Sequence, residues 1–460
     1  MAFNVIDAVI QPHMSADALT QPQVCQVGCN LYAVFGDTRI FPHDSHATLM
    51  YKSTDAVNWT LLDDSNSPYF GKGNNEVQVS LSVYQGTIYA LGGVAIGAPS
   101  PPFDTFDASS NMKYWTFNPA PPIPFDPNGV WVAKTALQAV QQTSVHDFLA
   151  VRKFFGTFRP DGSYILAYTI IGIDGNAETI VRKRTVGGVW STLATFSSPS
   201  PDDDVGALFQ SGLMITDGTI YLTFLLVSSV DDAGTLRVAS ISTSDVVSGM
   251  MLIEANITAA NQGSPGGNYT CQADFISGEI AFAYPANITS WDTALGDMHI
   301  ARGDISVTPL APTWTIEVAA SGNSSTPSFP GPSVGVVYLG SDIHVYWAKP
   351  NNANPQLATG SLLYRSVKHL GVWGVPSLLY TDNRGPNGQL NVIKYNNQVG
   401  LLWAVQGFGP LFQGSSQICP AIEVDLTFNL ALALNPSAPP PPGGPPPQPG
   451  VVPRRCIPQS

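Results

Sequence analysis

Residues 206–254 decide the fold: GALFQSGLMITDGTIYLTFLLVSSVDDAGTLRVASISTSDVVSGMMLIE. Four segments read as strands, at 206–215, 219–228, 235–242 and 247–254. The turns between them contain Asp217-Gly218 and Asp231 to Gly234, and such residues adopt the positive φ angles that tight hairpins require. Four short strands joined by hairpins predict one four-stranded antiparallel sheet.

The same unit recurs along the chain. Seven turn signals are each followed by an apolar anchor residue: Leu31, Ile88, Tyr164, Ile220, Ile280, Ile343 and Val399. An apolar residue also stands two places after each anchor, and in six units an aromatic stands four places after it. A period of two places these side chains on one face of a strand. A unit repeated every 56 to 76 residues predicts an all-β fold, a β-propeller of seven four-stranded blades. A stacked solenoid is the alternative.

We expect residues 1–434 to form the propeller and residues 435–460 a separate tail. Residues 3–10 and 421–434 read as strands, and pairing them within one blade would close the ring. The tail is so rich in proline that it predicts an extended, stiff segment. Such an arm suits contact with other subunits of an assembly, with Arg454 and Arg455 as candidate tether residues.

Composition argues against several classes of function. The net charge is −13 and only 12% of the residues are charged, so neither a nucleic acid nor an anionic membrane is an expected partner. No apolar run predicts a membrane span, and residues 1–23 lack the pattern of a signal peptide. We therefore expect a soluble product made without a recognisable export signal.

The five cysteines cannot all pair within one chain. Cys25 and Cys29 are expected to be small buried residues of a strand. Cys456 lies in the proline-rich tail, where an intermolecular disulfide is the hypothesis.

A tryptophan followed by a small residue recurs in five units. The set comprises Trp59, Trp115, Trp190, Trp314 and Trp373. A large aromatic fills the widening gap between neighbouring blades, so we expect these rings to pack there.

Residues 53–60, STDAVNWT, resemble the Asp-box of sialidase-like propellers, although the usual glycine is missing. In that family the motif builds the turn between the two outer strands of a blade. The resemblance assigns Ser53, Asp55 and Trp59 to such a turn, which supports the fold and not a catalytic role.

Residues 39–42, RIFP, resemble a disturbed form of the arginine-isoleucine-proline motif of sialidases, with Phe41 inserted. In that family three arginines clamp the substrate carboxylate, a tyrosine assisted by a glutamate attacks the anomeric carbon, and an aspartate donates the proton. No other arginine lies in a motif that identifies it as a partner of Arg39, so a turn role is favoured. Asp126 to Gly129 resemble the nucleophile motif of fructan and sucrose hydrolases, but the tetrapeptide is also a favourable β-turn.

No catalytic, cofactor-binding or metal residue is predicted. His43 and His46 lack further ligands nearby. Asp202 to Asp204, and separately Asp174, Asn176 and Glu178, group oxygens as calcium sites do, but solvated turns are favoured.

The favoured function is a non-enzymatic structural or adhesive propeller of a multi-subunit assembly. A tailed-phage virion component such as a tail, collar or capsid appendage fits best, in contact with another protein or a host glycan, and located on the virion or outside the cell. Two alternatives stay open: a sialidase-like glycoside hydrolase and a glycan-binding lectin.

Overall fold

The described residues of the computed structural model form strands and turns, with no helix among them. They are residues 2–5, 23–37, 45–56, 58–62, 69–72, 78–93, 112–118, 130–133, 148–172, 177–197, 207–227, 234–257, 271–287, 296–321, 333–351, 361–382, 387–395, 398–406 and 416–424. The strands form seven antiparallel sheets, which we number as blades in chain order.

Blades 1 to 3 come from the first part of the chain. Blade 1 contains β2 (Gln23–Val27), β3 (Asn30–Asp37), β4 (Ser45–Ser53), β5 (Trp59–Leu61) and β6 (Tyr69–Lys72). Blade 2 contains β7 (Gln78–Tyr84), β8 (Thr87–Gly93), β9 (Met112–Asn118) and β10 (Val130–Ala133). Blade 3 contains β11 (Phe148–Phe158), β12 (Tyr164–Gly172), β13 (Ala177–Arg184) and β14 (Trp190–Phe196).

Blades 4 to 7 follow in the same manner. Blade 4 contains β15 (Ala207–Met214), β16 (Ile220–Val227), β17 (Gly234–Ile241) and β18 (Met251–Glu254). Blade 5 contains β19 (Gln272–Ile276), β20 (Glu279–Ala286), β21 (Asp297–Asp304) and β22 (Thr313–Ala320). Blade 6 contains β23 (Ser333–Leu339), β24 (Asp342–Pro350), β25 (Ser361–His369), β26 (Val372–Trp373) and β27 (Ser377–Asp382). Blade 7 contains β28 (Asn387–Tyr395), β29 (Gln398–Gln406), β30 (Ser416–Val424) and β1 (Ala2–Val5).

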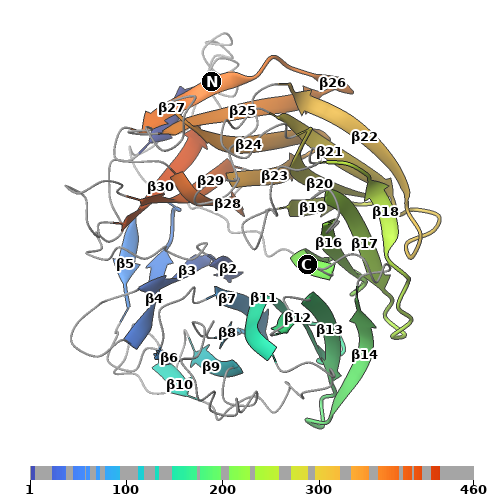
Figure 1. Ribbon diagram of the computed structural model, residues 1–460. Coiled ribbons are helices and arrows are strands. Elements are labelled where there is room, and N and C mark those ends of the chain that lie inside the picture. The colour runs from blue at the N-terminus through green and yellow to red at the C-terminus, as the bar shows by residue number, and fades with distance from the viewer. Residues whose placement is uncertain are drawn as a thin grey trace, which may run out of the picture.

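The sheets stand around a common centre (Figure 1). The first strand of each blade contacts that of the next, in the order β2, β7, β11, β15, β19, β23, β28 and back to β2. The prediction of an all-β propeller is confirmed. The prediction of four strands in each blade is correct for five of the sheets. Blades 1 and 6 contain five strands each. In blade 6 the outer strand is split into β26 and β27, because Pro376 between them has no N–H to continue the ladder.

The two ends of the folded chain meet in blade 7. Strand β1 pairs antiparallel with β30, from Ala2 opposite Val424 to Val5 opposite Ala421. This confirms that the chain ends close the ring. The Tyr395 hydroxyl of the same blade lies within hydrogen-bonding distance of the backbone oxygens of Cys29 and Thr54 in blade 1, at 2.9 and 2.6 Å, and shares its one hydrogen between these two acceptors.

The core follows the predicted repeat. Every anchor lies in the second strand of its blade and is at most 7% exposed. The residues two places after the anchors are fully buried as well. The side chains that the structure describes four places after the anchors are also fully buried; these are Tyr168, Phe224, Tyr284 and Trp347. These second strands are buried on both faces because neighbouring blades cover each sheet.

Three of the repeated tryptophans pack between blades, as predicted. Trp59 packs against a cluster that includes Ile393 of blade 7. Trp314 lies against a cluster that includes Tyr221 of blade 4, and Trp373 against one that spans blades 5 and 6. The side chain of Trp115 lies outside the described part, and Trp190 borders a cavity considered below.

Two expectations need correction. The last strand of blade 4 is only Met251–Glu254, because Val247 forms a single bridge to Ile241 before the chain turns. Cys29 is not a buried residue: it lies exposed in the turn between β2 and β3 and is disulfide-bonded. Cys25 is a free thiol in β2, and burial raises its pKa to about 12.

Candidate functional site

The Asp-box-like segment forms the turn between β4 and β5, the outer strands of blade 1. The Asp55 carboxylate accepts hydrogen bonds from the Ser53 hydroxyl at 3.1 Å and the Asn58 backbone N–H at 2.7 Å. The Trp59 indole donates to the Ala56 carbonyl at 3.1 Å. All of these hydrogen bonds are made within the turn. The motif therefore stabilises the blade and offers no group to a substrate.

The other residues proposed from the sequence lie outside the described part of the chain. They are Arg39, His43, His46, Asp126, Asp174, Asn176, Asp202, Asp203, Asp204, Arg454, Arg455 and Cys456. Glu178 is described, in β13. Within the described ranges, no group of three or more histidine, cysteine or carboxylate side chains could hold a metal ion. In those ranges no helix has the length and apolarity to cross a membrane.

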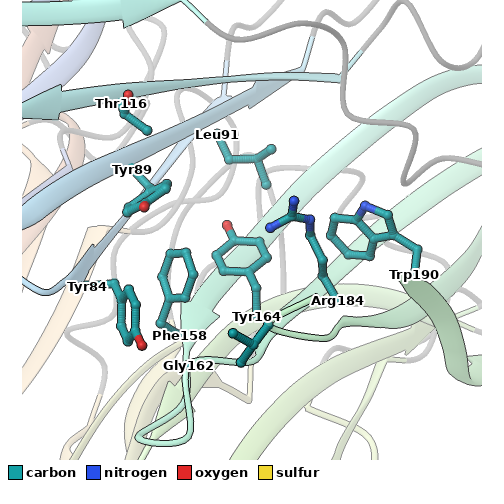
Figure 2. Close-up of a pocket in the computed structure, with 10 residues that line it drawn as sticks. Tyr84, Tyr89, Leu91, Thr116, Phe158, Gly162, Tyr164, Arg184 and Trp190 are labelled. Atoms are coloured by element: carbon teal, nitrogen blue, oxygen red, sulfur yellow. The ribbon is translucent and has the colours of Figure 1, made fainter. Parts of the chain in front are cut away.

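A cavity of about 270 Å³ lies between blades 2 and 3 (Figure 2). Its lining comprises Tyr84, Tyr89, Leu91, Thr116, Phe158, Gly162, Tyr164, Arg184, Val186 and Trp190. Five of these ten side chains are aromatic, one is cationic and none is acidic. We call this cavity the aromatic pocket.

The rings of the aromatic pocket touch one another in a continuous series. Phe158 is central: it stacks on Tyr84 with ring centroids 4.8 Å apart and an interplanar angle of 19°. Tilted contacts link it to Tyr89 at 4.6 Å and to Tyr164 at 4.7 Å. The series ends at Trp190, whose ring meets Tyr164 edge-on at 6.4 Å. Because each ring is held by its neighbours, the pocket is formed before any ligand arrives.

Hairpin ends bring these side chains together. Tyr84 ends β7, Phe158 ends β11 and Tyr164 begins β12, so all three stand next to tight turns. Gly162 has φ +80°, and a Cβ on it would lie 2.5 Å from the Tyr84 hydroxyl oxygen. Only glycine therefore permits this turn to approach the neighbouring blade so closely.

Arg184 supplies the charge of the pocket. It ends β13, it is half-buried, and its side chain lines the pocket together with Tyr164 and Trp190 (Figure 2). Its backbone pairs with β12 and β14, but no residue that the structure describes forms an ion pair or hydrogen bond with its guanidinium. By contrast, the buried Arg159 donates to Asp245 at 2.6 Å and to the Ser242 carbonyl at 2.6 Å.

A second polar cluster joins blades 4 and 5. The Glu254 carboxylate accepts a hydrogen bond from the Tyr284 hydroxyl at 2.7 Å and lies 2.9 Å from His299 Nδ1. Burial alone would raise the pKa of Glu254, but the hydrogen bonds from His299 and Tyr284 hold it below its ordinary value. Tyr284 and His299 are themselves buried, so the cluster serves as a contact between blades and not as an open site.

Sequence reasoning missed the aromatic pocket, although one signal was present. Six of the seven anchors are aliphatic, and only the anchor of blade 3, Tyr164, is aromatic. The repeated Trp190 stands in the same blade. Tyr84 and Tyr89 come from blade 2, and nothing in the linear sequence indicates that they face blade 3.

Comparison with protein-family models gives no match, and comparison with curated proteins gives none either. Among solved structures, polysaccharide lyase Uly1 aligns with a TM-score of 0.51 and 13% identity, over 89% of this chain and 90% of that chain. The shared feature is the β-propeller fold. A mutant of Trypanosoma rangeli sialidase that displays trans-sialidase activity aligns with a TM-score of 0.45 and 10% identity, over 91% of this chain and 56% of that chain. A Penicillium chrysogenum α-L-arabinanase aligns with a TM-score of 0.42 and 11% identity, over 74% of this chain and 92% of that chain.

These similarities concern architecture. The chain spans only 56% of the sialidase chain that it matches. The β-propeller fold that the sequence resemblance implies is the fold that this chain shares with the lyase.

Proposed function

We propose that the protein is a non-enzymatic, carbohydrate-binding β-propeller whose aromatic pocket holds a sugar ring. The observation that carries the proposal is the series of five touching rings around one cavity. Sugar rings carry apolar C–H faces that pack on aromatic side chains, and their hydroxyls need a few polar partners at the edge of the site. Thr116 and Arg184 provide such partners here.

The size of the pocket limits the ligand. Cavities that hold drug-sized molecules span roughly 300–1,000 Å³, and this one measures about 270 Å³. A ligand of one or two rings fits best, as expected for the end or a short stretch of a glycan. Hydrolysis would require a positioned acid and a second carboxylate. The ten described residues that line the aromatic pocket include neither.

An adhesive role in a larger assembly belongs to the same proposal. A rigid ring that presents a sugar pocket suits a virion appendage that contacts a host glycan, with residues 435–460 as the tether. The acidic, charge-poor composition supports a position on the surface of such an assembly.

Titration calorimetry after a glycan-array screen tests the binding function. The Trp190→Ala variant should bind the best glycan about tenfold more weakly, a change of about 1.4 kcal/mol. Trp373→Ala is the matched control, since Trp373 stands in the outer strand of blade 6, away from the aromatic pocket, and donates to Glu317 of blade 5. That variant should lose stability but keep its affinity.

Two results would overturn the proposal. One is unchanged affinity in both Trp190→Ala and Tyr84→Ala, with both variants shown to be folded by their melting curves. The other is turnover of fluorogenic glycosides by the wild-type protein, which would favour the glycoside hydrolase alternative.

A further inference from the structure

We infer that the aromatic pocket selects an acidic sugar, with Arg184 binding its carboxylate. This inference rests on the proposed function and names the ligand class. Its basis is that, among the ten described lining residues, Arg184 is the one cationic side chain and the other nine are aromatic, apolar or neutral.

The state of Arg184 differs from that of Arg159 and Arg302. Arg302 pairs with Glu279 and Glu317, and Arg159 pairs with Asp245, so these guanidiniums are already neutralised. Arg184 is half-buried beside two aromatic rings without an acidic partner among the described residues. A partly desolvated charge gains most from a ligand that brings the opposite charge.

The surroundings of Arg184 favour an anion at this place. The carboxylate of the adjoining turn, Asp161, accepts hydrogen bonds from the Ser163 backbone N–H and hydroxyl at 2.8 and 2.6 Å and is engaged in its own turn. The Nη2 atom of Arg184 would lie 3.2 Å from a Cβ on Gly188, so the absence of a side chain there leaves room for the guanidinium.

A carboxylated sugar matches both parts of the pocket. Its ring faces pack on Tyr164 and Trp190, while its carboxylate accepts two parallel hydrogen bonds from the planar guanidinium. The net charge of −13 repels anions at long range, so selection of an acidic sugar requires a local cation such as Arg184.

The test compares oligogalacturonides and glucuronate-terminated oligosaccharides with their own methyl esters, which match them in size and shape but lack the charge. The wild-type protein should bind the free acid about tenfold or more tightly than the ester. Arg184→Gln should abolish the preference, so that the free acid and its ester bind with the same affinity. Arg184→Lys should keep part of the preference, because a point charge remains without the bidentate geometry. Lys52→Gln removes one positive charge in blade 1 and should change neither affinity.

Equal affinity for acid and ester in the wild type, or a preference that survives Arg184→Gln, overturns the inference and leaves sugar binding intact. Sulfated neutral sugars bound in place of the uronates would also overturn it. Failure to bind any sugar, acid or ester, would instead remove the proposed function itself.

Discussion

Gly162 links the backbone of one turn to the shape of the aromatic pocket. Its φ of +80° lies in the left-handed region, where a side chain costs about 1–2 kcal/mol. A methyl group there would also collide with the Tyr84 hydroxyl. One glycine therefore determines both the stability of the hairpin and the position of a ring that lines the pocket.

We expect Gly162→Ala to lower the free energy of unfolding by about 1–3 kcal/mol and to weaken sugar binding, because Tyr84 must move. Chemical denaturation measures the first effect and calorimetry the second. The control is Gly187→Ala in the neighbouring turn, where the nearest atom is 3.8 Å from the added Cβ and stability should change by less than about 0.5 kcal/mol. Equal stability of the two variants would refute the strain argument.

At the scale of elements, ion pairs tie one blade to the next. The Glu317 carboxylate of β22 accepts hydrogen bonds from Lys368 of β25 at 2.5 and 2.6 Å and from the Trp373 indole at 2.8 Å. It also accepts one from Arg302 of its own blade at 2.8 Å. Lys368 is only 9% exposed, so this carboxylate neutralises a charge that water cannot reach.

Glu317→Gln should therefore cost about 3–5 kcal/mol, the usual effect of leaving a buried charge unpaired. Asp342→Asn is the matched control, because its partner His369 is 66% exposed and an exposed pair contributes at most about 1 kcal/mol. Thermal melts of both variants at neutral pH measure the difference. Comparable losses of stability in the two variants would mean that burial does not determine how strongly these ion pairs stabilise the fold.

The contrast between inner and outer strands explains which parts of the fold could be predicted from the sequence. The second strand of each blade is buried on both faces, so its apolar residues recur at fixed positions and predict the propeller. The outer strands are short and partly exposed. β26 has only two residues, Val372 and Trp373, and no local pattern predicts that Pro376 splits it from β27.

The aromatic pocket could be predicted only in part for the same reason. Tyr164 and Trp190 stand at repeat positions and are conspicuous in the sequence. Tyr84 meets Phe158 across the gap between two blades, 74 positions apart along the chain by their numbers. Contacts of that kind follow from the geometry of the ring and not from any local pattern.

For the whole molecule, the ring is closed by the pairing of β1 with β30, and β30 ends at Val424. Removing residues 436–460 should leave the melting temperature unchanged, because β1 pairs with residues 421–424 and these remain. Under the proposed tether role of residues 435–460, the truncated protein should fail to join the proposed assembly, which co-sedimentation with the assembled particle measures. Normal assembly of the truncated protein would refute the tether.

Three neighbouring interfaces of the ring depend on carboxylates in the same way. Asp245 of blade 4 accepts hydrogen bonds from Arg159 and Lys183 of blade 3, Glu254 binds blade 5, and Glu317 binds blade 6. Burial alone would raise the pKa of each, but the hydrogen bonds that they accept outweigh it, and all three pKa values lie below the ordinary range. Each ionised carboxylate therefore contributes stability that its protonated form lacks.

The direction of the pH dependence follows from this shift. A carboxylate whose pKa is lowered by folding contributes its full stability above the unfolded value, about 4, and loses it as the pH falls through the folded value. The melting temperature should hence be nearly constant between about pH 5 and 7 and fall steeply below about pH 4. A triple variant, Asp245→Asn, Glu254→Gln and Glu317→Gln, should melt lower at pH 7 and respond less to acid. Scanning calorimetry of both proteins across this pH range tests this prediction. If the melting temperatures of the variant and the wild type fall in parallel as the pH is lowered, acid acts elsewhere in the molecule. If the two melting temperatures converge at low pH, the stability that acid removes comes from these contacts between blades.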